Sequence, residues 1–369
     1  MNGQHGDSTR SVTAVNSEAL AGQPVSHGPV PASAYHLSPV EGSEPDTYGR
    51  SSNPTWRHLE SALAQLEGAT TAVTFGSGMA AITAALRVLA EPGSVLVVPA
   101  DGYYQVRRFA AEKLAPLGIT VQEAGADEIC EAAEGADVVL AETPTNPALD
   151  VVDLHRLAGI CRRRGARLLV DNTAATPLAL QPLSLGADLV VASATKALSG
   201  HSDLLAGYIA GSQPELMAAL ERERLLSGAI LGSFEAWLVL RSIGSVGLRF
   251  VRQCQNALAL ATALRGHPAV GSVRYPGLPE DPSYPAATAQ MRRFGGLLCL
   301  ELADAAAVHD LVRRSELLVA STSFGGLHTS VDRRARWGDA VPAGFARISA
   351  GIEDTDDLVA DVLAALEPN

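Results

Sequence analysis

Residues 189–196, which read LVVASATK, join a short apolar run to a polar turn that ends in a lysine. Lysine is rare in this chain, because only Lys113 and Lys196 among its 28 basic residues are lysines. The apolar run is continuous rather than alternating, which is typical of a strand buried on both faces of a parallel sheet. Ligands of such sheets bind beyond the carboxyl ends of the strands, so we expect Lys196 at a ligand-binding edge.

Further apolar runs alternate with amphipathic helices on either side of this stretch. Strands are predicted at 71–75, 95–98, 138–141, 168–170 and 205–210, and helices at 80–89, 107–115 and 153–163. Continuous apolar strands joined by helices predict an α/β fold whose mainly parallel sheet is covered on both faces.

The pattern changes beyond about residue 235. A long helical pattern at 234–264 precedes a strand-like run at 296–302, a helix at 305–314 and a last helix that begins near Asp354. We therefore predict an N-terminal arm at 1–54 without sustained periodicity, a large domain at 55–234 and a smaller α+β domain at 235–369.

Composition excludes several classes of function. The chain has 369 residues, 47% of them hydrophobic, and a net charge of −12, which argues against binding to nucleic acid. No apolar run approaches the roughly 18 residues of a membrane span, and the first residues lack the layout of a signal peptide. Four scattered cysteines without a C-x-x-C pair favour reduced thiols in the cytoplasm over disulfides or a metal site.

Polar and glycine residues follow each predicted strand of the large domain. They are Gly76–Met79, Asp101–Tyr104, Glu142–Pro147, Asp171–Thr173 and Ser193–Lys196. Because the carboxyl ends of parallel strands meet at one edge, glycines, hydroxyls, an aromatic ring, an acid and a lysine are expected together there.

Two cofactors could use this edge. The spacing Gly76-x-Gly78-x-x-Ala81 resembles a dinucleotide-binding turn, but that interpretation leaves Lys196, Asp171 and Tyr103 without roles. Pyridoxal phosphate (PLP) needs a lysine for an imine, an acid for its ring nitrogen and helix-terminal amides for its phosphate. The edge supplies each of these groups, so we favour PLP.

The chain resembles the Cys/Met-metabolism family of PLP enzymes, which includes cystathionine γ-lyases and γ-synthases. The segments that carry the resemblance are Tyr48–Arg50, Asn53–Thr55, Ser77–Ala80, Glu142–Pro147, Val170–Thr173, Ser193–Lys196, Gly200–Asp203, Phe294–Gly296 and Arg347–Glu353. The resemblance implies the PLP-dependent transferase fold of aspartate aminotransferase (fold type I), and a homo-oligomer that is at least a dimer and usually a tetramer.

The resemblance also implies a role for each site residue. Lys196 forms the imine and moves protons, Asp171 pairs with the ring nitrogen, and Tyr103 stacks on the ring and assists in proton transfer. The implied phosphate contacts are Gly78, Met79, Ser193 and Thr195, with Tyr48 and Arg50 of the neighbouring subunit. The implied substrate contacts are Arg347 for the α-carboxylate, Asn146, Ser323, and Arg108 near the distal end.

Departures from the family pattern gather on the substrate side. Gln105 replaces the cysteine of methionine γ-lyases, which disfavours that activity, and Thr322 replaces a common glutamate. The roles of Tyr104 and His328 stay open. The sequence favours α,γ-elimination of L-cystathionine, with γ-replacement on an activated homoserine and β-elimination as alternatives. A catalytically silent PLP protein is a further alternative of a different class.

Overall fold

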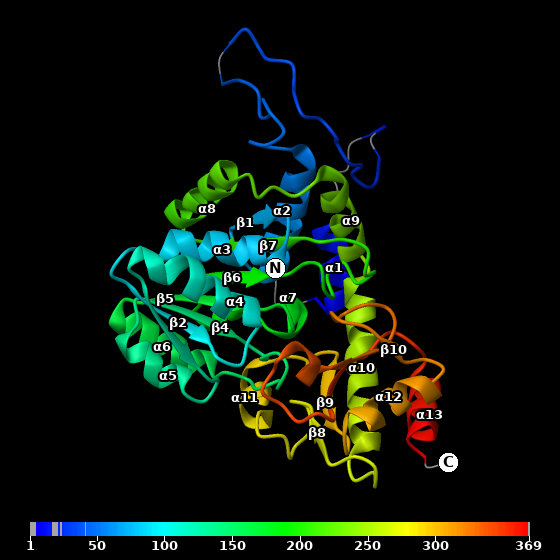
Figure 1. The fold of residues 1–369 in the computed structure, drawn as a ribbon. Helices are drawn as coiled ribbons and strands as arrows, with labels where there is room; N and C mark the ends of the chain where they lie inside the picture. The colour runs from blue at the N-terminus through cyan, green and yellow to red at the C-terminus, as the bar shows by residue number, and fades with distance from the viewer. Residues whose placement is uncertain (1–4, 17–20, 23, 41, 368–369) are drawn as a thin grey trace.

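The computed structural model describes residues 5–16, 21–22, 24–40 and 42–367. Its larger sheet has seven strands in the order β1-β7-β6-β5-β4-β2-β3 (Figure 1). The strands are β1 (Thr71–Phe75), β2 (Val95–Pro99), β3 (Thr120–Ala124), β4 (Val138–Glu142), β5 (Arg167–Asp171), β6 (Leu189–Ala192) and β7 (Gly207–Gly211). Strands β2 to β6 are parallel to one another, and β7 is antiparallel to both β6 and β1. The predicted α/β fold with a mainly parallel sheet is confirmed.

Helices cover both faces of this sheet. They are α2 (Pro54–Glu67), α3 (Gly78–Leu89), α4 (Tyr104–Phe109), α5 (Ile129–Ala132), α6 (Leu154–Arg164), α7 (Thr176–Ala179) and α8 (Pro214–Ser227), with short turns η1 (Ala110–Leu114), η2 (Ala115–Leu117), η3 (Ala133–Gly135) and η4 (Pro182–Leu185). Successive strand side chains enter different cores: Leu140 joins the core under α3, whereas Val139 and Ala141 join the core under α6. This alternation buries each central strand on both sides.

A second sheet follows two consecutive helices, α9 (Ser233–Ile243) and α10 (Val246–Leu264). Its strand order is β10-β11-β12-β9-β8. The elements are β8 (Ser272–Arg274), α11 (Tyr284–Gln290), β9 (Leu297–Glu301), α12 (Ala305–Arg314), β10 (Val319–Ala320), β11 (Ser330–Arg333), η5 (Arg334–Trp337), β12 (Phe345–Ser349) and α13 (Thr355–Leu366). Leucines and alanines of α10, α12 and α13 pack with the sheet in a separate core.

One described segment of the predicted arm is helical. Residues Asp7–Ala14 form helix α1, whose buried Arg10 donates to the Leu66 carbonyl at 2.8 Å. Arg293 pairs with Asp7 at 2.7 Å and holds the start of α1. An eight-residue polar helix has too few apolar positions to produce a periodic pattern. The described residues that follow α1 extend away from both sheets before α2 begins (Figure 1).

The structure corrects one further predicted element and adds a strand that the sequence did not predict. The long helix predicted at 234–264 is divided into α9 and α10 around Gly244 and Ser245. Strand β3 was not predicted, because its residues TVQEA lie at the sheet edge with several side chains exposed. No helix among the described residues combines the length and the hydropathy needed to cross a membrane.

Candidate active site

A cavity of about 530 Å³ lies where the carboxyl ends of β4, β5 and β6 meet the loop after β10. Its lining residues are Ser77, Gly78, Met79, Ile82, Tyr103, Tyr104, Glu142, Asn146, Asp171, Thr173, Ala174, Ser193, Thr195, Lys196, Leu205, Thr322, Ser323, Phe324, Arg334, Trp337 and Arg347. The expected gathering of polar residues at one sheet edge is therefore present. Both sheets contribute walls to the cavity.

Lys196 lies in the turn that follows β6. Buried Arg249 of α10 donates to the Ala197 carbonyl at 2.8 Å and to the Leu198 carbonyl at 3.1 Å. Gly325 has a φ of +78°, and a Cβ on it would lie 2.5 Å from the Ala197 nitrogen. The backbone of the loop after β10 therefore packs directly on the lysine turn, which only glycine permits.

The Lys196 amine points toward that loop. Its Nζ donates to Ser323 Oγ at 2.6 Å and lies 5.1 Å from the centre of the Phe324 ring. Burial, followed by the positive charge of Arg347, lowers the pKa of Lys196 to about 8. A lowered pKa leaves a larger share of the amine neutral near physiological pH, as a nucleophilic lysine requires.

Two carboxyl groups lie side by side at the ends of β4 and β5, where Glu142 and Asp171 are paired in register. Burial raises the pKa of Asp171, although the Thr173 side chain and backbone stabilise its carboxylate. Burial and then the Asp171 charge raise the pKa of Glu142 well above its ordinary value. Glu142 accepts the Tyr103 N–H at 2.7 Å, and this hydrogen bond favours the charged carboxylate and so acts against the two effects that raise its pKa.

An anion-binding corner lies at the start of α3. The Ser77 side chain accepts the Ala80 N–H, while the Gly78 and Met79 amides precede the first intrahelical donors. A Cβ on Gly78 would lie 2.7 Å from the Ser193 Cβ, so the helix terminus and the turn after β6 approach closely. Thr195 lies in the same wall, with its hydroxyl bonded to the Ala206 backbone.

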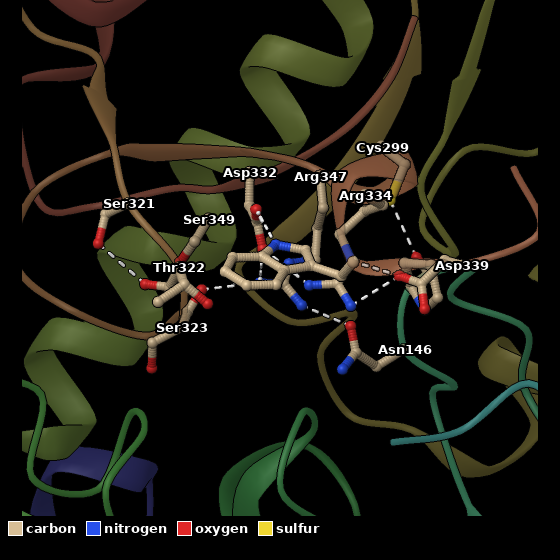
Figure 2. A network of polar contacts seen from close by, with 12 residues as sticks. Asn146, Cys299, Ser321, Thr322, Ser323, Asp332, Arg334, Asp339, Arg347 and Ser349 are labelled. Atoms are coloured by element: carbon tan, nitrogen blue, oxygen red, sulfur yellow. Dashed lines mark hydrogen bonds and ion pairs between the residues drawn. The ribbon is translucent and has the colours of Figure 1, made fainter. Parts of the chain in front are cut away.

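Arg347 of β12 also lines the cavity, and Figure 2 shows it beside Asn146 and Asp332. Its Nη1 donates to Asn146 Oδ1 at 2.5 Å, and its Nη2 donates to the Ser323 carbonyl at 2.8 Å. Burial lowers the pKa of Arg347 to about 10, although the negative charge of Asp332 acts in the opposite direction. The buried Nε has no hydrogen-bond partner among the described residues. Arg347 therefore keeps donor capacity for an anion in the cavity.

The structure brings together most of the residues predicted from the sequence. Three residues lie elsewhere in this chain. Tyr48 and Arg50 are stacked on each other at the base of the arm, where Arg50 donates to the Leu225 carbonyl at 3.0 Å. Arg108 is exposed on α4 and pairs with Glu112 at 2.7 Å, so the structure does not bring it into the cavity.

Several cavity residues were not predicted as site residues from the sequence. Glu142 was noted only as part of a segment, whereas Arg334 and Trp337 come from a segment that departs from the family pattern. Asp332 is not one of the lining residues, but it contacts both Arg334 and Trp337. β11 has the sequence SVDR with a single apolar residue, so no apolar pattern marked Asp332. The position of η5 depends on tertiary packing, which no local pattern reveals.

The donor set fits PLP. The cofactor has a ring nitrogen, an aldehyde and a phosphate. A buried carboxyl group, a lysine with a lowered pKa and the amides at a helix start are the protein groups that suit them. Among the described residues, no three His, Cys, Asp or Glu side chains gather as metal ligands. The fold and the site define a PLP-dependent enzyme.

The chain belongs to the family described as Cys/Met metabolism PLP-dependent enzymes, whose model matches residues 13–367. A Streptomyces coelicolor protein, provisionally named a cystathionine gamma-lyase, is 46% identical over 98% of this chain and 94% of its own. The cystathionine gamma-synthase of Mycobacterium tuberculosis is 36% identical over 86% of each chain. A crystal structure of a cystathionine gamma-lyase from Micromonospora echinospora has a TM-score of 0.90 and 34% identity, covering 99% of this chain and 100% of that one.

Proposed function

We propose that the protein is a PLP-dependent carbon–sulfur lyase that cleaves L-cystathionine by α,γ-elimination to L-cysteine, 2-oxobutyrate and ammonia. The observation that carries the proposal is that a lysine amine with a lowered pKa lines one cavity together with Asp171 and the Arg347 guanidinium. Relatives named as lyases, including the Streptomyces protein, support elimination over replacement.

The cofactor is held in this proposal by groups on the large-sheet side. Asp171 bonds the ring nitrogen, Tyr103 covers the ring, and the Gly78 and Met79 amides with Ser193 and Thr195 bind the phosphate. When bound, PLP supplies the electron sink that lets a proton leave the substrate α-carbon. Tyr48 and Arg50 of a neighbouring subunit complete the phosphate site. Within one chain, these two residues do not line the cavity.

The substrate is oriented by groups on the other wall. Arg347 binds the α-carboxylate through its planar fork, with Asn146 and Ser323 beside it. Lys196 Nζ then takes up and returns protons at the substrate carbons, and Ser323 Oγ receives a hydrogen bond from the amine between transfers. Burial raises the pKa of the Tyr103 hydroxyl, so it keeps its proton at neutral pH.

The decisive experiment measures products. Purified holoenzyme incubated with L-cystathionine should release cysteine, 2-oxobutyrate and ammonia in equal amounts, and no 2-oxobutyrate would refute the proposal. Relatives named as γ-synthases support a second candidate, γ-replacement on an O-acyl-L-homoserine with a thiol nucleophile. Turnover of an O-acyl-L-homoserine with and without cysteine separates the two. Replacement consumes cysteine and forms L-cystathionine, whereas elimination releases the acyl carboxylate, 2-oxobutyrate and ammonia without consuming cysteine. Formation of pyruvate would identify β-elimination instead.

A further inference from the structure

The carboxylate of Asp332 is shared by two arginines (Figure 2). Its Oδ2 lies 2.7 Å from Arg334 Nη1 and 3.4 Å from Arg347 Nη2. Its Oδ1 accepts the indole N–H of Trp337 at 2.8 Å. Both of the shorter contacts come from η5, the short turn that follows β11. Asp332 is therefore held mainly by η5 and only weakly by Arg347.

Without η5, Asp332 and Arg347 would be natural partners. They are directly opposite each other in the antiparallel pair β11 and β12, and both side chains are almost fully buried. Opposite charges at facing positions of a sheet attract, and burial strengthens that attraction. A full ion pair with Asp332 would occupy donors that Arg347 otherwise offers to the cavity.

Arg334 is itself anchored away from Arg347. Its Nε and Nη2 both lie 2.7 Å from Asp339 Oδ2, so Asp339 holds the guanidinium from the far side. The two arginines and the two aspartates cancel in charge. Removing the Arg334 charge would leave a net negative cluster beside Arg347, which would repel an incoming carboxylate.

We propose that Arg334 and Trp337 are positioning residues that keep the Asp332 carboxylate off Arg347, so that Arg347 can bind the substrate α-carboxylate. The proposal rests on the proposed function only in taking the substrate to be an α-amino acid. Neither residue needs to touch that carboxylate, because both act through Asp332.

The test separates carboxylate recognition from all other binding. L-Alanine and ethylamine differ only in the carboxylate, and neither carries a leaving group. Their dissociation constants are measured from the absorbance change of the PLP-loaded enzyme. In Arg334→Met, L-alanine should bind roughly tenfold more weakly, whereas ethylamine should change by less than about twofold.

A double variant distinguishes positioning of Asp332 from a purely structural role of Arg334, because only positioning predicts that binding recovers. Adding Asp332→Asn to Arg334→Met removes the competing charge, so L-alanine binding should return to within about threefold of the parent protein. Equal weakening of both ligands in Arg334→Met, or no recovery in the double variant, would overturn the proposal. Weaker binding of L-cystathionine alone would also overturn the proposal, because Arg334 would then contact the distal end of the substrate directly.

Two further variants keep the test decisive if Arg334→Met does not fold. Trp337→Phe removes only the indole donor and should weaken L-alanine alone. Asp332→Asn by itself should strengthen the binding of L-alanine relative to that of ethylamine. If the ratio of the two dissociation constants is unchanged in both variants, the proposal is overturned. Because L-alanine has no γ-substituent, these results do not depend on whether the enzyme cleaves L-cystathionine.

Discussion

Lys196 Nζ donates a hydrogen bond to Ser323 Oγ at 2.6 Å, although the two residues follow strands of different sheets. Lys196 follows β6 of the seven-stranded sheet, and Ser323 follows β10 of the five-stranded sheet. The reactive amine is therefore located at the contact between the two halves of the molecule. Changes at this contact should affect the cofactor and the substrate together.

The identity of the imine-forming lysine can be tested by borohydride reduction. In the parent protein, reduction should fix one PLP per chain on Lys196, whereas Lys196→Ala should retain none after denaturation, as judged by intact mass. Lys113→Arg is the matched control, because Lys113 is exposed and outside the cavity, and it should behave as the parent does. Fixation on Lys113 would contradict the assignment.

The lowered pKa of Lys196 predicts how cofactor capture depends on pH. Only the neutral amine attacks an aldehyde, so the rate at which the cofactor-free protein binds PLP should rise with pH and level off above about 8. Stopped-flow absorbance at a series of pH values measures this profile. A rate that continues to rise toward the ordinary lysine pKa would show that burial and Arg347 do not act on the amine as inferred.

Arg249 should contribute to stability through the lysine turn. Replacing it with Met leaves three buried carbonyls, of Ala197, Leu198 and Ser242, without this donor, which should cost about 2–4 kcal/mol of unfolding free energy. Arg252→Met on the same helix removes a partly exposed pair with Asp354 and a 3.3 Å hydrogen bond to the Glu353 carbonyl, and should cost less than about 1 kcal/mol. Urea unfolding of both variants tests the difference, and equal costs would contradict it.

Glu67 should make the protein less stable as pH rises. Burial raises its pKa to about 7, and its carboxyl is bonded to the Tyr208 hydroxyl at 2.5 Å. Between the ordinary pKa of 4.5 and about 7, the folded state binds more protons than the unfolded state, so stability falls as pH rises through this window. Glu67→Gln should therefore raise the melting temperature by a few degrees at pH 8 and change it little at pH 5.

Shared sites between subunits can be tested by complementation. Arg50→Ala should weaken PLP binding only through a neighbouring subunit, and Lys196→Ala should abolish turnover in its own chain. When the two variants are co-expressed with separate tags and purified through both tags, the mixed dimer should regain up to about half of parent activity, because one of its two sites is intact. An inactive mixed dimer would contradict the sharing of Arg50.

The sequence was most informative where local pattern and burial agree. The run at 189–192 and the helix at 305–314 were predicted with the bounds that the structure has, because continuous apolar runs and helical spacing are local properties. The residues after these strands also assembled as expected, since parallel strands present their carboxyl ends at one edge.

The predictions failed where position depends on packing between distant segments. Helix α1 is held by Leu66 and Arg293, neither of which is near it in sequence. Arg108 follows the family pattern but lies outside the cavity, whereas Arg334 departs from that pattern and lines it. The assignment of Tyr48 and Arg50 to a partner, the domain boundaries, the tetramer and the cytoplasmic location stay predictions.

The contrast between the two lysines gives the protein a natural chemical probe. Apart from the α-amino group, its only primary amines are an exposed one on η1 and a half-buried one in the cavity. An amine-directed acylating reagent can therefore modify at most these two side chains. Peptide mass mapping would then report cofactor occupancy as protection at a single position, with Lys113 as the internal standard of the same molecule.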